Sequence, residues 1–272
     1  MVADLHFQEG QRILDLGSGP GLWTSMFAEK VAPCGQVIGL DFSAQLIDYA
    51  VSRLDEDPRR ELINFTLGDF STVPFRGRTF DAVFMGNCLS YVPDALGVIH
   101  EMKRVTRPGG RVVSKEFDDA TLIFHPIDPH LTAKVLQAVT GALYKAPDLV
   151  HHGGQGPPAS PDPFVAVEAS VPHFDSFMGR KMHGLFLRSG FVDVSTTPYA
   201  IQKVPPLGPA AKRYMQGNGK WLGATAAPYL CDEDQRRWEA AFDPAADEYV
   251  LDNEDFYFCM TEMVTIGTLG LG

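Results

Sequence analysis

Three glycines follow a short hydrophobic run near the start of the chain, in the segment 12–21 (RILDLGSGPG). Because Gly17, Gly19 and Gly21 have no Cβ and tolerate positive φ, a ligand can lie directly against the backbone of such a loop. The dinucleotide fingerprint G-x-G-x-x-G requires a glycine where this chain has Leu22, which disfavours a nicotinamide-dependent oxidoreductase. The loop alone also fits a structural turn, so its neighbours in the sequence decide its interpretation.

Polar residues at the ends of the following predicted strands strengthen the interpretation of this loop as a binding site. Asp41 ends the next predicted strand, where a carboxylate can accept hydrogen bonds from both hydroxyls of a ribose. Asp69 follows the third strand and could accept from an adenine amino group, while Phe70 could line the pocket for the ring. Asn87 follows the fourth strand, at the edge where ligands of such sheets bind. These residues predict a nucleoside site.

Two side chains are candidates for acid–base chemistry near this site. Tyr91 lies in the segment after the fourth predicted strand, and His125 follows the fifth, where the substrate side of such a fold opens. Glu116, Asp118 and Asp119 crowd the end of the fifth strand and could orient a base, or could form a charged rim. Histidine is only intermediately buried in proteins, so a purely structural role for His125 is the alternative.

The elements that must position these residues alternate between short β-like runs and amphipathic segments up to about residue 116. The predicted strands are Arg12–Leu16, Gln36–Asp41, Asn64–Leu67, Phe80–Met85 and Gly110–Phe117, and the predicted helices are Leu22–Val31, Ser43–Leu54 and Leu96–Val105. This alternation predicts βαβ units and a parallel sheet. The strands are almost continuously apolar, as expected for a sheet that is covered on both faces.

The second half of the chain lacks this regular alternation of predicted strands and helices. Its predicted elements are a helix over Leu131–Leu143, a Gly- and Pro-rich loop over His151–Pro163, a helix over Phe177–Arg188, a strand over Phe191–Val204, mainly helical structure over Pro205–Asp255 and a final strand over Phe256–Gly267. The many aromatic and methionine side chains after residue 118 could line a pocket for a flat or apolar molecule, or could simply form the core of a subdomain.

The predicted domain organisation follows from this change of pattern. We expect a cofactor-binding Rossmann-like core at 1–117, a lid or cap insertion at 118–176, a core helix and strand at 177–204, a helical substrate-side insertion at 205–255 and the final core strand at 256–272. The two insertions are longer than strand connections require, and such insertions are typical places for a substrate-specific cap. Because only eleven residues precede Arg12, we expect either that a cover for the site comes from elsewhere, such as 118–176, or that the chain starts late.

Composition excludes several classes of protein. The 272 residues are 45% hydrophobic and 21% charged, which is typical of a globular protein, and the net charge of −11 disfavours a nucleic-acid partner. No apolar stretch predicts a leader or a membrane span, and the dispersed cysteines fit free thiols, so a cytoplasmic location is expected. The adjacent His151 and His152 lack a rigid scaffold and a third ligand, so no metal site is predicted.

The chain resembles class I S-adenosylmethionine-dependent methyltransferases, particularly the small-molecule branch related to quinone-biosynthesis enzymes. The motifs ILDLGSGPG, IGLDFS, GDF, FDAVFMGNCLSYVPD and RPGGRVV stand in the order of that family. The resemblance is dense from residue 12 to about 117 and fainter at GLFLRSGFVDV. It implies a doubly wound α/β fold with a mostly parallel seven-stranded sheet whose last strand is antiparallel, and a helical substrate cap completes the predicted fold.

The same resemblance implies which residues bind S-adenosylmethionine. The predicted cofactor-binding set is Asp15, Gly17, Gly19, Gly21, Asp41, Phe42, Asp69, Phe70 and Asn87. Asp15 and Gly17 would lie beside the methionine end of the cofactor, Asp41 would hold the ribose, Asp69 and the phenylalanine after it would hold the adenine, and Asn87 would lie near the methionine or the reacting centre.

The predicted activity is methylation of a small organic acceptor, on the oxygen of a carboxylate or phenol, as in secondary metabolism. The motifs leave open a C- or N-methyltransferase, and also a regulatory protein that binds S-adenosylmethionine without turnover. Tyr91 and His125 are the catalytic candidates. No membrane partner is predicted, and the sequence does not indicate an oligomeric state.

Overall fold

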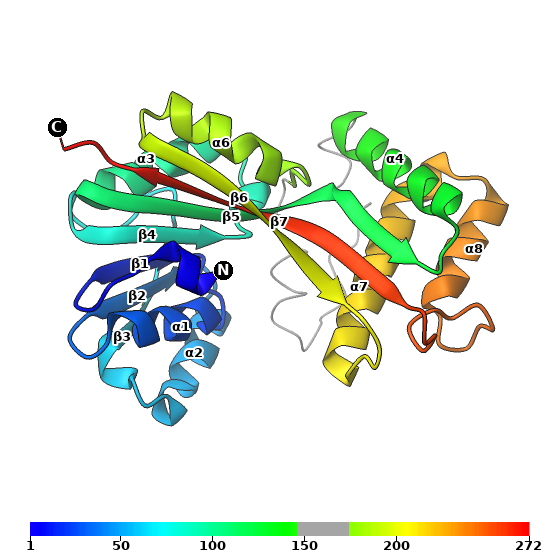
Figure 1. Cartoon of the computed structure of the whole chain (residues 1–272), viewed down its shortest axis with the longest axis horizontal. Helices are drawn as coiled ribbons and strands as arrows, with labels where there is room; N and C mark the ends of the chain where they lie inside the picture. The colour runs from blue at the N-terminus through cyan, green and yellow to red at the C-terminus, as the bar shows by residue number, and fades with distance from the viewer. Residues whose placement is uncertain (146–173, 272) are drawn as a thin grey trace.

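A seven-stranded sheet is the framework of the molecule, in a computed structural model that describes residues 1–145 and 174–271. The strands lie in the order β3-β2-β1-β4-β5-β7-β6 (Figure 1). Their bounds are β1 Arg12–Leu16, β2 Gln36–Asp41, β3 Ile63–Leu67, β4 Phe80–Gly86, β5 Thr106–His125, β6 Val192–Lys203 and β7 Tyr257–Thr268. Strands β1 to β5 pair in parallel, and β7 is antiparallel to both of its neighbours. The predicted sheet with an antiparallel last strand is therefore confirmed.

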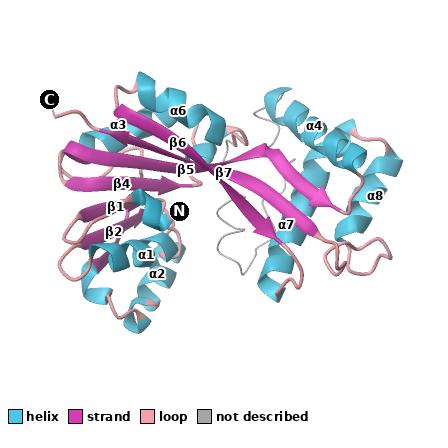
Figure 2. Ribbon diagram, in the orientation of Figure 1, coloured by secondary structure: helices cyan, strands magenta, loops and turns pink. Residues whose placement is uncertain are grey.

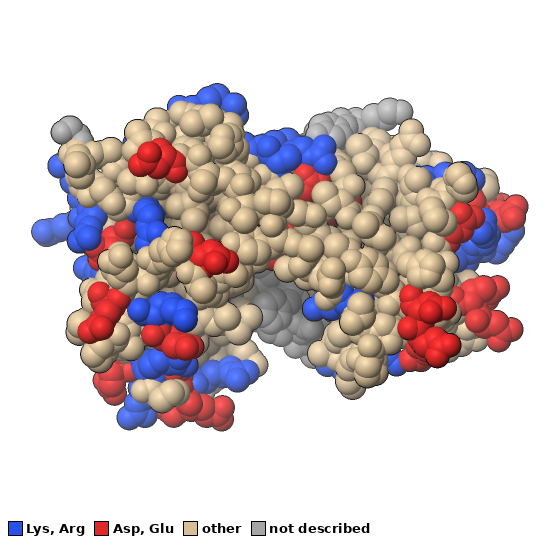
Figure 3. Space-filling view, in the orientation of Figure 1, with Lys and Arg blue, Asp and Glu red and all other residues tan. Residues whose placement is uncertain are grey.

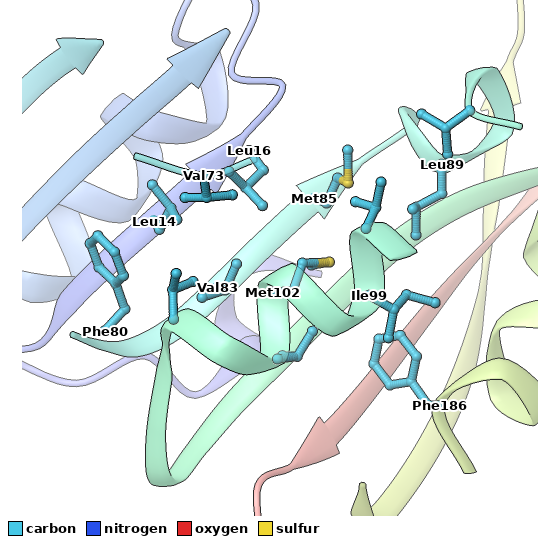
Figure 4. Packing of buried hydrophobic residues seen from close by; sticks show 14 of the residues in the cluster. Leu14, Leu16, Val73, Phe80, Val83, Met85, Leu89, Ile99, Met102 and Phe186 are labelled. Atoms are coloured by element: carbon cyan, nitrogen blue, oxygen red, sulfur yellow. The ribbon is translucent and has the colours of Figure 1, made fainter. Parts of the chain in front are cut away.

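Helices cover both faces of the inner sheet (Figure 2). Their bounds are α1 Leu22–Val31, α2 Ala44–Ser52, α3 Ala95–Val105, α4 Pro129–Lys145, α6 Met178–Arg188, α7 Pro209–Ala226 and α8 Asp232–Phe242. Helix α1 packs on one face, and α3 and α6 pack on the other, where their apolar side chains meet those of β1 and β4 (Figure 4). Ser43 begins α2 as predicted, because its Oγ accepts a hydrogen bond from Leu46 N at 3.3 Å.

Strand β5 is much longer than the predicted strand Gly110–Phe117, since it runs from Thr106 to His125. It pairs with β7 over 111–118 and again over 123–125, with a register shift between the two stretches. Strand β6 accompanies β7 along almost its whole length. The three long strands β5, β6 and β7 therefore leave the inner sheet and reach a second group of helices (Figure 1).

This second group, which we call the cap, consists of α4, α7, α8 and the outer parts of β5, β6 and β7. It has its own apolar cluster, in which the fully buried Trp238 and Phe242 of α8 pack against Phe124 of β5 and Phe258 of β7. A helical cap is thus present as expected, although its first part is strand. The predicted loop over 151–163 lies outside the described residues.

The carboxyl ends of the parallel strands β1 to β4 lie at one edge of the sheet and face the cap (Figure 1). On the face drawn in Figure 3, Lys and Arg are interspersed with Asp and Glu. Within the described ranges, no helix is long and apolar enough to cross a bilayer. The fold therefore leaves the strand ends that carry the predicted site residues opposite the cap.

Candidate active site

The glycine loop after β1 is packed tightly against Cys88 and Phe65. Gly17 and Gly21 have φ of 68° and 81°, which other residues rarely adopt. A Cβ on Gly17 would lie 2.4 Å from Cys88 Sγ, and a Cβ on Gly21 would lie 2.5 Å from Cζ of Phe65. Glycine is therefore required at both positions on grounds of backbone conformation and of space.

Asp41 at the end of β2 holds this loop in place. Its Oδ2 accepts a hydrogen bond from Gly19 N at 2.9 Å, and its Oδ1 accepts from Ser43 N at 2.9 Å. Only 5% of the Asp41 residue is exposed. Each carboxylate oxygen has two lone pairs, so both oxygens keep the capacity to accept a ligand hydroxyl. The structure thus brings the loop and the predicted ribose-binding carboxylate together.

Asp15 lies beneath the loop and is 1% exposed. Its Oδ2 accepts a hydrogen bond from Thr24 Oγ1 at 2.6 Å. Burial raises the pKa of Asp15 to about 7; the Thr24 hydrogen bond opposes this rise, and the neighbouring charge of Asp41 adds to it. A cation bound beside Asp15 would favour its ionised form, so this carboxyl group is suited to a positively charged ligand.

The residues predicted for the adenine lie beside Asp41 but differ in exposure. Gly68 N donates to the Asp41 carbonyl at 2.9 Å, which joins the ends of β2 and β3. Asp69 is exposed and accepts from Ser71 N at 2.7 Å, while Phe70 is half-buried against the core. Phe42 is 47% exposed. Asp69 and Phe70 could thus hold an adenine ring, whereas a role for Phe42 stays a prediction.

Two buried polar atoms near the loop have no hydrogen-bond partner among the residues that the structure describes. Asn87 follows β4 with φ of 55°, and its Oδ1 is buried without a hydrogen bond, as is Oγ of Ser18 in the loop. The backbone N of Asn87 donates to the Lys115 carbonyl at 2.7 Å. Because buried polar atoms are nearly always satisfied, the unpartnered Asn87 oxygen indicates a polar group of a ligand at the end of β4. S-Adenosylmethionine fits this donor and acceptor set.

Glu116 of β5 fixes the segment that follows Asn87. Its side chain is fully buried, with Oε1 accepting from Cys88 N at 3.1 Å and Leu89 N at 2.9 Å, and Oε2 from Ser90 Oγ at 2.7 Å. Burial raises the pKa of Glu116 to about 7 against the effect of these hydrogen bonds. The alternative of an exposed charged rim is therefore wrong for Glu116, which positions backbone instead.

An aromatic ledge joins this segment to the cap. We use this name for Tyr91, Phe117, Phe174 and Trp221, which are all half-buried. The ring centroid of Phe174 lies 5.1 Å from that of Tyr91, 5.8 Å from that of Phe117 and 5.4 Å from that of Trp221. The ledge thus links the segment after β4, strand β5 and helix α7. Of the two catalytic candidates, Tyr91 lies here.

The structure does not bring His125 to the aromatic ledge. Because β5 continues through the acidic residues at which it was expected to end, His125 is the last residue of this strand and pairs with Tyr257 in the cap. At a rise of about 3.3 Å per residue, the eight residues beyond Phe117 place it on the order of 20 Å away. The expectation that His125 follows the strand at the substrate opening is therefore wrong.

Sequence reasoning missed Lys115, Trp23 and Glu262, which surround Asn87. Lys115 Nζ lies 2.6 Å from Glu262 Oε1 and 5.6 Å from the centroid of the Trp23 ring. A lysine two residues after the apolar pair Val112 and Val113 in a predicted core strand was the available signal, since such a charge is rarely buried without a reason. Nothing in the sequence links it to a glutamate 147 residues away.

Comparisons with known proteins agree with this geometry. Residues 13–110 match the family described as a methyltransferase domain. A demethylmenaquinone methyltransferase of Lactococcus lactis is 43% identical over 113 residues, covering 42% of this chain and 44% of the relative. One of Anoxybacillus flavithermus is 40% identical over 199 residues, covering 72% of this chain and 76% of the relative. The chain spans about half the length of several curated relatives, including 50% of one from Geobacillus.

Solved structures share the fold. The YcgJ protein of Bacillus subtilis has a TM-score of 0.59 at 17% identity, covering 100% of this chain and 97% of that one. A putative methyltransferase of Bacillus halodurans also has a TM-score of 0.59, at 12% identity, with 99% and 97% covered. At these identities the likeness concerns the fold alone.

The chain belongs to the class I S-adenosylmethionine-dependent methyltransferases. Among its relatives are the demethylmenaquinone methyltransferases, so the predicted similarity to quinone-biosynthesis enzymes is confirmed. This membership supports the predicted class of enzyme and its cofactor, S-adenosylmethionine, and the reaction of this chain is proposed below.

Proposed function

We propose that this protein transfers the methyl group of S-adenosylmethionine to a small organic acceptor with a flat ring. The observation that carries the proposal is the position of the aromatic ledge relative to the glycine loop: Tyr91 of the ledge lies three residues after Cys88, whose Sγ is 3.8 Å from the Gly17 carbonyl oxygen. The loop suits the cofactor and the ledge suits the acceptor. Their juxtaposition suits transfer between the two.

Charge supports the choice of cofactor. S-Adenosylmethionine has a sulfonium, an ammonium and one carboxylate, so its net charge is positive. Asp15 and Asp41 are buried beside the loop, and Asp69 lies next to them. Opposite charges close together favour the ionised carboxylates. When bound, the cofactor supplies an electrophilic methyl group on sulfur.

The protein would contribute mainly orientation and exclusion of water. Asp41, Asp69 and Asn87 would hold the cofactor, while the segment fixed by Glu116 would present Tyr91 toward the acceptor. The acceptor nucleophile forms a bond to the methyl carbon as the carbon–sulfur bond breaks, with the electron pair going to sulfur. Holding two reactants in line, in a site shielded from water, accelerates such a displacement without further chemistry.

The acceptor atom we favour is an oxygen of a phenol or of a carboxylate attached to a ring. A carboxylate is already ionised at neutral pH, whereas a phenol with a pKa of about 10 must lose its proton to a base as it reacts. The name of the relatives, demethylmenaquinone methyltransferase, identifies a quinone as the molecule they methylate. A quinol ring offers carbon as well as oxygen nucleophiles, so C-methylation is the second candidate.

The test is a transfer assay with methyl-labelled S-adenosylmethionine and three acceptors: a hydroquinone, a simple phenol and an aromatic carboxylic acid. We expect labelled product from at least one of them, with formation of S-adenosylhomocysteine in equal amount. Label released as methanol by mild base identifies a carboxylate ester, and label that persists identifies an ether or a carbon product. Binding of S-adenosylhomocysteine without transfer to any acceptor would favour a regulatory protein instead.

A further inference from the structure

Lys115 is the one buried cation among the residues that the structure describes. Its side chain is 5% exposed, and it lies on β5 level with Gly86 at the end of β4. Its ammonium contacts Glu262 Oε1 at 2.6 Å and lies over the ring of Trp23. Burial of an ammonium costs several kcal/mol by general estimates, and a single carboxylate partner often does no more than offset this cost. A second anion beside Lys115 would account for its position.

Lys115 and Glu262 are part of a polar group that continues to the cofactor loop. Asn87 Nδ2 donates to the same Glu262 Oε1 at 3.4 Å, and Asn87 Oδ1 is buried without a partner in the described part of the chain. The next residue, Cys88, contacts the loop, with its Sγ 3.8 Å from the Gly17 carbonyl oxygen. We call Lys115, Glu262 and Asn87 the Lys115 node.

The other charged groups around this node are carboxylates. Asp15, Asp41 and Glu116 are buried at the neighbouring strand ends, and Glu262 belongs to the node itself. A ligand with a carboxylate group would be repelled by this set unless a cation stood beside it. Lys115 is the buried cation that could do so. A ligand ammonium, by contrast, suits both Glu262 and the unpartnered oxygen of Asn87.

We propose that the Lys115 node receives the amino-acid end of S-adenosylmethionine, with Lys115 facing its carboxylate and Glu262 and Asn87 facing its ammonium. This assignment rests on the proposed function, since it takes S-adenosylmethionine to be the bound cofactor. The zwitterionic end of the ligand has the same two charges as the Lys115–Glu262 pair, so binding adds no net charge to the interior. The competing role is purely structural, with the Lys115–Glu262 ion pair only joining β5 to β7.

The experiment compares two ligands on the whole protein by titration calorimetry. S-Adenosylhomocysteine has the amino-acid end, and 5′-methylthioadenosine has the same nucleoside and sulfur without it. We expect Lys115→Met to weaken binding of S-adenosylhomocysteine at least about tenfold, the size of a lost charge-assisted hydrogen bond, with less than about twofold change for 5′-methylthioadenosine.

Lys103→Met is the matched control. Lys103 is also half-buried over an aromatic ring, 5.7 Å from the centroid of Phe191, and its Nζ donates to the Ser189 carbonyl at 2.6 Å. It lies on α3, away from the node, and its loss should change neither affinity. If Lys115→Met does not fold, the double variant Lys115→Met/Glu262→Gln removes both charges together and is expected to show the same selective loss.

The outcomes separate the node from the proposed function. Equal losses of affinity for both ligands in Lys115→Met, or no loss for either, would overturn the assignment and leave the purely structural role. Unchanged affinity for S-adenosylhomocysteine with weaker acceptor binding would assign the node to the acceptor and overturn it as well. If the unaltered protein bound both ligands equally well, the node would be excluded while the cofactor class stood. Binding of neither would contradict the proposed function itself.

Discussion

Strands β5 and β7 pair with each other in both the core and the cap, but their inner and outer parts carry different residues. In the inner part, Lys115 and Glu116 of β5 and Glu262 of β7 place charges in the interior. In the outer part, Phe124 of β5 and Phe258 of β7 are buried against the helices of the cap. The polar inner part lies at the candidate site, and the apolar outer part supports what covers it.

This difference indicates that the inner and outer parts of these two strands are stabilised in different ways. The core buries ionisable groups whose removal from water is unfavourable, and it offsets them with hydrogen bonds from backbone, as at Glu116. The cap has an apolar cluster with interlocked aromatic rings. Natural proteins accept less favourable interiors at functional sites. We therefore expect cofactor binding to depend on the core, and the stability of the cap to depend on its own apolar cluster.

The largest expected effect comes from Trp238→Ala in the cap. Trp238 is 1% exposed, its Nε1 donates to the Gly219 carbonyl at 2.7 Å, and its ring packs on Phe124 and Phe242. Loss of a buried Trp costs roughly 3–5 kcal/mol of unfolding free energy. We expect methyl transfer to be lost while the affinity for S-adenosylhomocysteine changes by less than about threefold, because the core does not share this cluster. Chemical denaturation and calorimetry measure both quantities.

Phe84→Ala is the matched variant in the core. Phe84 is also 1% exposed and lies on β4 just before the site, where a Cβ on Gly86 would lie 2.9 Å from its ring. We expect a similar loss of stability, together with a loss of cofactor affinity. If Trp238→Ala weakened binding as much as Phe84→Ala, the proposed separation between core and cap would be contradicted.

The second prediction concerns Asp41→Ala, which should weaken S-adenosylhomocysteine binding by roughly 1–3 kcal/mol. The variant removes the acceptor for Gly19 N and the carboxylate expected to meet the ribose. Asp234→Ala serves as the control in the cap, since Asp234 is also buried and pairs with Lys134 at 2.6 Å. It should leave the affinity unchanged. A change below a few tenths of a kcal/mol for Asp41→Ala would mean that other groups hold the ribose.

The third prediction is a pH dependence that belongs to the core. Folding raises the pKa of Asp15 from 3.8 to about 7, so the folded state binds more protons between these values, and stability falls as pH rises through this window. Glu116 and Asp119, whose pKa values burial also raises to about 7, contribute slopes of the same sign. We expect the free energy of unfolding of Asp15→Asn at pH 8 to be roughly 1–3 kcal/mol higher than that of the unaltered protein, with a smaller difference at pH 5.

Cofactor binding should change in the opposite direction. Asp15→Asn removes a negative charge beside the loop, so its affinity for the positively charged S-adenosylmethionine should fall while its stability at pH 8 rises. Chemical denaturation at both pH values and calorimetry at pH 8 provide the measurements. A variant that is less stable at pH 8 would show that Asp15 is stabilising when ionised, against the effect of its burial.

The elements of the core were predictable because local signals mark them. The strand β1 and the helix α1 have the predicted bounds, and glycine and proline punctuate the turns between elements. Strand β5 was predicted too short because Glu116, Asp118 and Asp119 suggested a solvent-exposed end. They are buried because partners distant in the sequence satisfy them, such as Arg180 for Asp118. Such partners are set by tertiary structure, which a local pattern does not contain.

The candidate site likewise contains residues that the sequence predicted and residues that it did not. The loop and Asp41 follow from the spacing of strand ends, because parallel strands bring their carboxyl ends to one edge. The aromatic ledge and the Lys115 node do not, since each joins elements from separate parts of the chain. His125 was misplaced for the related reason that its position depended on where β5 ends. Residues fixed by one strand end could be predicted, and residues fixed by contacts between elements far apart in the sequence could not.

The smallest expected effect distinguishes two glycines in the same cap helix, α7. A Cβ on Gly217 would meet no atom within 4 Å, so Gly217→Ala should stabilise the protein by roughly 0.5–1 kcal/mol through helix propensity alone. A Cβ on Gly219 would lie 2.3 Å from Cγ of the buried Phe242 ring, so Gly219→Ala should destabilise by roughly 1–3 kcal/mol. Neither should change cofactor affinity, because neither touches the core site. Thermal unfolding with and without S-adenosylhomocysteine tests both, and an equal shift for the two variants would show that α8 does not pack closely on α7.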